Sequence, residues 1–343
     1  MFAKLLFNGD GVLIFFTLSG YILARILVGR LSSAKQLDLR AYFMRRLTRL
    51  EPPYLLVMTG MFVLLSLSGD HGEYTKSFHK GADSLISAWL FSVIYAYCPT
   101  FGAMPKLNPP AWSLEIEVQF YVLAPLLVWL RTRLQSKARF PTAVAGVICW
   151  SVIISPLASN PHLRYTLLRF FPFFLGGFAV LEIQQLLSAT QASWRERIRP
   201  VFDIIAVFAF VGLISREYWM PVWAQTWVQP VGTLLFVSGC LFGGVVRQLL
   251  SIPLLSMIGG MCYSIYLVHL GILEIVSNFT VRIGKGYPFF VFLSIQLLLL
   301  GSIVLIVSWV FFRLVERPCM DRNWPYKFWL FARRRILQSS RPD

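Results

Sequence analysis

The stretch WSLEIEVQFYVLAPLLVWL, residues 112–130, decides the fold class, because it is an almost unbroken apolar run that opens with two carboxylates. A carboxylate is costly inside a membrane helix, so its presence at the start of one suggests a functional site. One helical face, at about 100° per residue, collects Ser113, Glu117, Tyr121 and Ala124. Glu115 falls on roughly the opposite face, so we expect only Glu117 to face into a helix bundle. The alternative interpretation is a helix-start carboxylate stabilised by the helix dipole.

The composition around this stretch indicates an integral membrane protein. Of 343 residues, 57% are hydrophobic and only 14% are charged, and the mean hydropathy is +0.64. Soluble domains carry about 25% charged residues. No linker separates two compositions, which favours one membrane domain over residues 1–318 and a basic tail over 319–343. In such a protein, basic loops that face the cytoplasm and anionic lipid explain the net charge of +16 better than nucleic acid does.

Cysteine and histidine give no sign of a metal or disulfide site. The five cysteines form no CxxC pair, and none has a spacing to histidine that would hold a metal. Most of them lie within apolar segments, where cysteine behaves as a small hydrophobic residue. We therefore expect no metal and no bound cofactor.

The apolar segments predict an all-α, polytopic bundle of about nine to ten transmembrane helices. A span needs about 20 apolar residues. Ten candidates lie near 12–29, 52–68, 84–101, 112–130, 142–158, 165–186, 202–214, 222–246, 253–276 and 289–314.

Basic residues concentrate in loops 30–51, 131–141 and 187–201 and after residue 313, and the positive-inside rule places such segments in the cytoplasm. All of these basic segments lie in the cytoplasm only if the apolar segment 84–101 does not cross the membrane. The consistent topology has nine spans and a cytoplasmic C-terminus, with residues 69–111 outside and 84–101 re-entrant or interfacial. It places the N-terminus outside, and a further helix before Met1 would make this natural.

Three motifs carry polar chemistry next to or within these spans. The first, GDGVLIFFTLSGY at 9–21, has small residues that let helices approach closely. The second is RRLTRLEPPY at 45–54, where Arg45, Arg46 and Arg49 share one helical arc and the two prolines suit the start of the next helix. Guanidinium groups bind phosphates bidentately, although ordinary cytoplasmic anchoring is the alternative for this cluster.

The third motif is CYSIYLVH at 262–269, in a predicted span over 253–276. Its polar face collects Gly259, Cys262, Tyr263, Tyr266 and His269. Each polar group inside a membrane needs a partner, so this face suggests a site, and a hydrogen-bonded structural histidine is the alternative.

These motifs, in this order and followed by VERP at 315–318, resemble the membrane-bound acyltransferase family 3, whose known members include O-acetyltransferases of bacterial surface polysaccharides. The resemblance implies an O-acyltransferase domain over 1–318 in the cell (inner) membrane. It implies acyl-CoA, with acetyl as the acyl group, as the co-substrate and a carbohydrate hydroxyl as the acceptor.

The resemblance also implies roles for single residues. Arg46 and Arg49 match an arginine pair associated with acyl-CoA, and Arg45 is a third candidate. Glu117, Tyr266 and His269 are the candidates for proton transfer and oxyanion stabilisation. The family's catalytic histidine sits in a helix upstream of the first motif. Only eight residues precede Gly9 and none is histidine, so we expect a late start site or a truncation.

Two other functions stay open. A transporter or a flippase of a glycan precursor would line its path with the same polar groups. A catalytically inactive, truncated paralogue would lack the upstream histidine.

Overall fold

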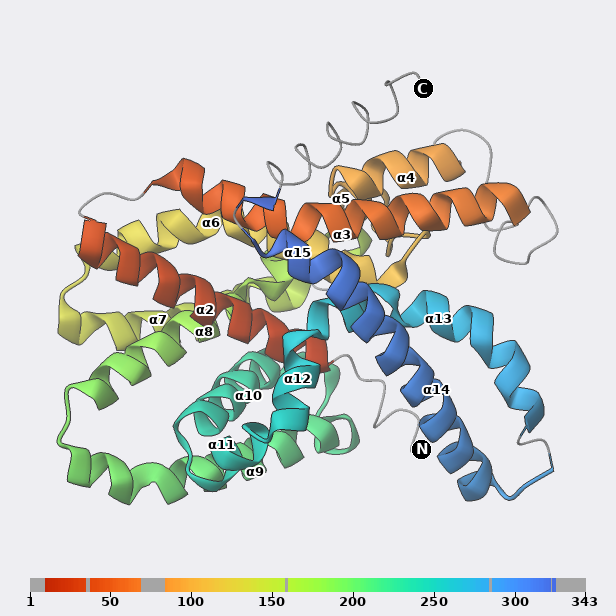
Figure 1. The fold of residues 1–343 in the computed structure, drawn as a ribbon. Helices are drawn as coiled ribbons and strands as arrows, with labels where there is room; N and C mark the ends of the chain where they lie inside the picture. Colours follow the sequence, from red (N-terminus) through yellow and green to blue (C-terminus); the bar gives the residue numbers. More distant parts are fainter. Residues whose placement is uncertain are drawn as a thin grey trace, which may run out of the picture. The chain divides into compact units, whose positions relative to one another are not determined.

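The computed structural model describes residues 10–34, 38–68, 84–157, 160–283, 286–321 and 323–324. Every regular element within these ranges is a helix, as Figure 1 shows, which confirms the all-α prediction. The chain divides into two compact units. The first unit comprises Met1–Leu37, Tyr95–Met104 and Trp112–Ser256, and the second comprises Asp38–Ile94, Pro105–Ala111 and Met257–Asp343.

The lengths and apolar composition of the helices support a polytopic membrane protein. Within the described ranges, seven helices are long and apolar enough to cross a membrane, or eight if a bent pair counts as one span. The predicted span at 222–246 appears as α10 (Val222–Phe242) but is not among the seven. Its first half carries Gln225, Thr226 and Gln229, which lower its apolar character. The count of nine therefore remains a prediction.

The first unit is built around helices α2 (Asp10–Ala34) and α8 (Leu167–Ser188), which touch backbone to backbone. A Cβ added at Gly20 would lie 2.3 Å from the carbonyl oxygen of Phe174, and one added at Gly177 would lie 2.3 Å from that of Thr17. The predicted close approach of the first motif is thus confirmed. In a bilayer, such contacts replace the hydrophobic effect as the source of helix association.

Helices α6 (Trp112–Arg133), α7 (Ser136–Ile154) and α10 pack against this pair. Helices α9 (Ala192–Trp219) and α11 (Val245–Leu250) pack against α10, and α5 (Tyr97–Phe101) packs against α6. The unit also contains the short turns η4 (Ser155–Leu157) and η5 (Pro161–Leu163). The core between α2, α6 and α8 is aromatic, with the rings of Phe120 and Phe174 stacked 4.0 Å apart and Phe16 against Phe174.

In the second unit, α3 (Leu39–Ser68) passes through the second motif without interruption. The expectation that Pro52 and Pro53 begin a helix is wrong, because both lie inside this one. Proline at 52 removes the N–H that would bind the carbonyl of Thr48. The indole N–H of Trp324 donates to that carbonyl instead, at 2.8 Å, so a distant side chain satisfies the orphaned acceptor.

The predicted span at 253–276 is broken. Its two parts, α12 (Pro253–Gly260) and α13 (Cys262–Ile283), are bent by 71°. Two adjacent glycines end α12, and glycine costs about 1 kcal/mol relative to alanine inside a helix. Gly259 therefore does not share a helix with Tyr263, Tyr266 and His269, which corrects the predicted face.

The remaining helices of the second unit are α4 (Leu85–Val93), η3 (Pro109–Ala111), α14 (Phe289–Phe311), the π-helical turn η6 (Phe312–Glu316) and α15 (Arg317–Cys319). Neither α4, with 9 residues, nor α5, with 5, is long enough to cross a membrane. This agrees with the expectation that 84–101 does not cross as one span. Residues 69–83 of the predicted outer segment and most of the predicted tail at 319–343 lie outside the described residues.

Candidate functional site

In the first unit, Glu117 lies on the buried face of α6 that its spacing predicted. Ser113, Tyr121 and Ala124 are buried with it, and the side chain of Glu117 is 5% exposed. The hydroxyl of Ser19 on α2 donates a 2.5 Å hydrogen bond to Oε1 of Glu117. The serine of the first motif is therefore a partner of the carboxylate as well as a small packing residue.

Glu115 corrects the expectation that only one acid is buried. Its side chain is fully buried, and Oε2 accepts a hydrogen bond from the backbone N–H of Cys98 at 2.8 Å. The reason is the short helix α5, which covers the face of α6 opposite Glu117. Burial, reinforced by the nearby Glu115 carboxylate, raises the pKa of the Cys98 thiol far above its usual range.

In the second unit, His269 is held in one tautomer by its own helix. Its Nδ1 lies 2.8 Å from the carbonyl oxygen of Tyr266 and 3.1 Å from that of Ile265. Carbonyl oxygens only accept, so Nδ1 carries the proton, and in the neutral ring Nε2 carries the lone pair. A histidine fixed in this way presents a base at Nε2.

Tyr266 is tied to the segment that precedes α6 in the chain. Its hydroxyl donates to the carbonyl oxygen of Pro110 at 2.6 Å, and its ring centroid lies 5.9 Å from that of His269. Asn108 in the same segment donates to the carbonyl oxygen of Leu267 at 3.0 Å. A phenol has one proton to donate, so in this conformation Tyr266 accepts rather than donates further bonds.

A carboxylate whose role no sequence pattern predicted, that of Glu316, links three motifs of the second unit. Glu316 ends the π-helical turn η6 and is fully buried. Its Oε2 accepts from the hydroxyl of Ser264 at 2.5 Å and from the backbone N–H of Ser264 at 3.2 Å, and its Oε1 lies 3.8 Å from a guanidinium nitrogen of Arg49. Glu316 and Ser264 lay within quoted motifs, but only the fold shows that they meet.

The two remaining arginines, Arg45 and Arg46, lie with Arg49 on α3, and all three are half-buried. The hydroxyl of Tyr263 donates to the carbonyl oxygen of Leu50 at 2.8 Å and so attaches α13 to this part of α3. Arg49, Tyr263, Tyr266 and His269 therefore belong to one packed region of the second unit. Glu117 belongs to the first unit.

Within the described ranges, no group of three or more histidine, cysteine, aspartate or glutamate residues could hold a metal ion.

Comparison with known proteins identifies the family. A family model described as an acyltransferase domain matches residues 9–313. The chain is 26% identical over 330 residues to a Staphylococcus aureus (strain COL) protein named "Putative O-acetyltransferase", a match that covers 90% of this chain and 52% of that protein. It is 25% identical over 341 residues to the "Putative peptidoglycan O-acetyltransferase YrhL" of Bacillus subtilis (strain 168), with 94% and 52% covered.

A third relative is the O-acetyltransferase OatA of Staphylococcus aureus (strain MRSA252), 24% identical over 347 residues, with 96% of this chain and 55% of OatA covered. No solved structure matches the chain. The chain thus spans about half the length of the curated relatives it matches. Because the family model covers nearly the whole chain and the quoted motifs lie in or next to the matched range, the protein belongs to the acyltransferase 3 family.

Proposed function

We propose that this protein is an O-acyltransferase that moves an acetyl group from acetyl-CoA to a hydroxyl of a cell-surface carbohydrate. The observation that carries the proposal is His269, which the carbonyl oxygens of its own helix hold with Nε2 as the basic nitrogen. Family membership and the relatives named O-acetyltransferases support the reaction class. The peptidoglycan in one relative's name supports a carbohydrate polymer as the acceptor.

The reaction replaces a thioester by an ester. His269 takes the proton of the acceptor hydroxyl at Nε2 while the oxygen attacks the thioester carbonyl carbon. The tetrahedral intermediate collapses as the carbon–sulfur bond breaks, and the imidazolium returns its proton to the departing CoA thiolate. Tyr266 acts as a positioning residue, because its hydroxyl fixes the 105–111 segment against the helix that carries His269.

The donor phosphates bind the arginines of α3. A guanidinium group forms paired hydrogen bonds to phosphate oxygens, which lysine cannot reproduce. Buried Glu316 and Ser264 orient Arg49 from behind, through the 3.8 Å ion pair and the 2.5 Å hydrogen bond. Arg45 and Arg46 supply the further positive charge that a CoA carrying several phosphate charges requires.

Glu117 is a second candidate for a proton-transfer role. It is buried in a predicted span and has a hydroxyl partner in Ser19. A buried carboxylate that is ionised can accept a proton from a hydroxyl or relay one through Ser19.

The orientation follows from the basic loops. We place the protein in the cell (inner) membrane with nine spans in this chain and a cytoplasmic C-terminus, so that the arginines of α3 face the compartment that contains acyl-CoA.

The donor assignment is tested by steady-state kinetics in membranes that contain the full-length protein, with radiolabelled acetyl-CoA. Arg45→Ala combined with Arg46→Ala should raise the KM for acetyl-CoA by about 10- to 100-fold, the loss expected for charge-assisted hydrogen bonds. Arg40→Ala is the matched control, because Arg40 is exposed near the start of the same helix. An unchanged KM for acetyl-CoA in the double variant would contradict donor binding by Arg45 and Arg46 and would favour membrane anchoring as their role.

A further inference from the structure

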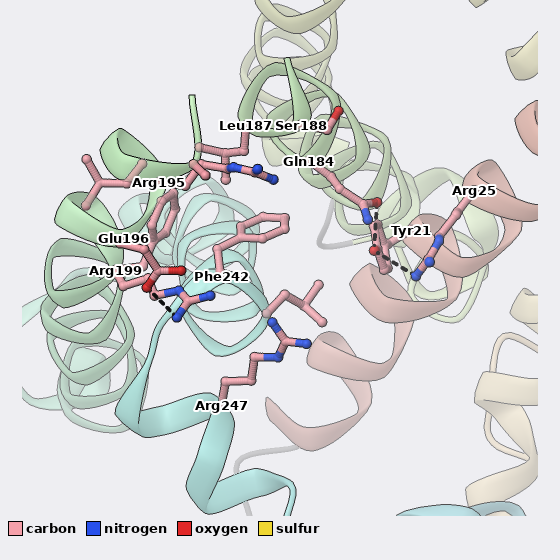
Figure 2. Close-up of a pocket in the computed structure, with 14 residues that line it drawn as sticks. Tyr21, Arg25, Gln184, Leu187, Ser188, Arg195, Glu196, Arg199, Phe242 and Arg247 are labelled. Atoms are coloured by element: carbon pink, nitrogen blue, oxygen red, sulfur yellow. Dashed lines mark hydrogen bonds and ion pairs between the residues drawn. The ribbon is translucent and has the colours of Figure 1, made fainter. Parts of the chain in front are cut away.

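A second group of arginines surrounds a pocket in the first unit. The pocket has a volume of about 520 Å³ and lies between the C-terminal halves of α2 and α8, the start of α9, and the α10–α11 corner. Four arginines and one glutamate line it. Figure 2 shows the guanidinium groups of Arg25, Arg195, Arg199 and Arg247 around one common space, with Phe242 beside it.

The positive charge of the pocket is largely uncompensated. Glu196 pairs with Arg199 at 2.6 Å, and both side chains are about half exposed. Within the described residues, no carboxylate forms an ion pair with Arg195 or Arg247. Tyr21 and Gln184 extend the polar wall, since the Tyr21 hydroxyl donates to Gln184 Oε1 at 2.9 Å and Arg25 lies 3.4 Å from the same hydroxyl.

The position of Arg247 is fixed by an unusual helix start. Both carboxylate oxygens of Asp203 on α9 accept hydrogen bonds from the backbone N–H groups of Gly244, which precedes α11, and of its first two residues, Val245 and Val246, at 2.9–3.1 Å. A Cβ at Gly243 would lie 2.4 Å from that carboxylate, so glycine is required for the close approach. The bonds anchor α11, which carries Arg247, against the start of α9, which carries Arg195 and Arg199.

We propose that this pocket binds a phosphate ester. Guanidinium groups on several helices match the several oxygens of a phosphate. Phe202, Leu241 and Phe242 in the same wall suit a ligand whose phosphate is attached to an apolar or aromatic portion. The basic residues at 187–201, among them Arg195 and Arg199, belong to the side predicted to be cytoplasmic, where both anionic lipid headgroups and soluble nucleotides occur.

Two sources offer this chemistry, the headgroup of an anionic phospholipid and the phosphates of CoA. Both are tested on purified full-length protein. Native mass spectrometry counts bound phosphatidylglycerol, with phosphatidylcholine of the same acyl chains as the zwitterionic comparison, and isothermal titration calorimetry measures binding of coenzyme A.

The test variant is Arg195→Gln with Arg247→Gln. The matched control is Arg133→Gln with Arg197→Gln, which removes the same charge from exposed arginines outside the pocket lining. We expect the test variant to bind one probe about 10- to 100-fold more weakly than the control variant does. Loss confined to phosphatidylglycerol identifies the lipid as the source, and loss confined to coenzyme A identifies the nucleotide.

Equal binding of both probes by the two variants would overturn the proposal, as would failure of the unaltered protein to prefer phosphatidylglycerol and to bind coenzyme A. This result is separable from the donor assignment on α3, because Arg45→Ala with Arg46→Ala leaves this pocket intact. If the Arg45→Ala, Arg46→Ala variant loses coenzyme A binding and the Arg195→Gln, Arg247→Gln variant keeps it, coenzyme A binds at α3. The ligand of the pocket is then the anionic phospholipid.

Discussion

The hydroxyl of Ser264 donates a 2.5 Å hydrogen bond to the carboxylate of Glu316, across 52 positions of the sequence. The pair joins α13, which carries His269, to the π-helical turn at the end of α14. Such turns occur often at functional sites, because they re-aim one side chain without ending the helix. Here the turn brings a fully buried carboxylate within 3.8 Å of Arg49.

Removing this carboxylate should destabilise the second unit. Glu316→Ala leaves the buried hydroxyl and backbone N–H of Ser264 without their acceptor, and an unsatisfied buried donor costs about 1–3 kcal/mol. Arg49 is partly exposed and can be solvated, so the lost ion pair adds little. We therefore expect the free energy of unfolding to fall by about 1–3 kcal/mol and the melting temperature in detergent to fall with it. Glu196→Ala breaks an exposed pair and should change the free energy of unfolding by less than about 1 kcal/mol. Equal melting temperatures of the two variants would contradict a stabilising role of Glu316.

Close contact between α2 and α8 predicts a sharp difference between two glycines of one helix. Gly20→Ala places a methyl group 2.3 Å from the Phe174 carbonyl oxygen, whereas Gly29→Ala meets nothing within 4 Å. Overpacking costs about 1–3 kcal/mol, so the melting temperature should fall for Gly20→Ala and stay the same or rise for Gly29→Ala. A Gly20→Ala protein as stable as the original would contradict the backbone contact.

The Cys98 thiol should resist alkylation over a wide pH range. A free thiol titrates near pH 8.5. Because burial raises the pKa of the Cys98 thiol, we expect this thiol to stay protonated in the folded protein at pH 9. A variant with Cys98 as its only cysteine should react slowly with maleimide at both pH 7 and pH 9, and rapidly after unfolding in detergent. A variant with only the exposed Cys262 is the comparison. Since the unfolded thiol ionises first, the contribution of Cys98 to stability falls as the pH rises past 8.5.

The predicted orientation is tested with two cysteines, introduced one at a time at exposed positions of a variant whose five native cysteines are replaced. Ala103→Cys lies in the predicted outer segment and Lys137→Cys in a predicted cytoplasmic loop. In intact cells, an impermeant maleimide should label the first and spare the second. Labelling of the second alone would invert the topology.

Local sequence rules predicted the features that depend on spacing within one helix. The buried face of Glu117 and the close approach at Gly20 follow from helical periodicity and residue size, and both are present. The burial of Glu115 could not be predicted from the periodicity of α6. The face of α6 that carries Glu115 is covered by the short helix α5, whose Cys98 donates a hydrogen bond to the carboxylate.

Long-range partners also explain the other differences. Proline is favoured in the first turn of a helix, yet α3 continues through Pro52. The Thr48 carbonyl that Pro52 leaves without its helical donor accepts a hydrogen bond from Trp324, far along the chain. The break after Gly260 divides one apolar run into two helices, which hydropathy alone does not register. The contacts of Glu316 with Ser264 and Arg49 join segments that are far apart in the sequence, so only the folded structure shows them.

The proposed reaction and the role of His269 are tested most directly by the initial rate of labelled acetyl transfer from acetyl-CoA to membrane-associated carbohydrate. This rate is compared between the unaltered protein and its His269→Gln variant. Loss of a general base typically lowers the rate by about 10²–10⁴-fold. We expect a fall of this size in kcat for His269→Gln, with the KM for acetyl-CoA and the protein abundance unchanged. Acetyl transfer at an unaltered rate in the variant would contradict the assignment of His269, and no transfer by the unaltered protein would contradict the proposed reaction.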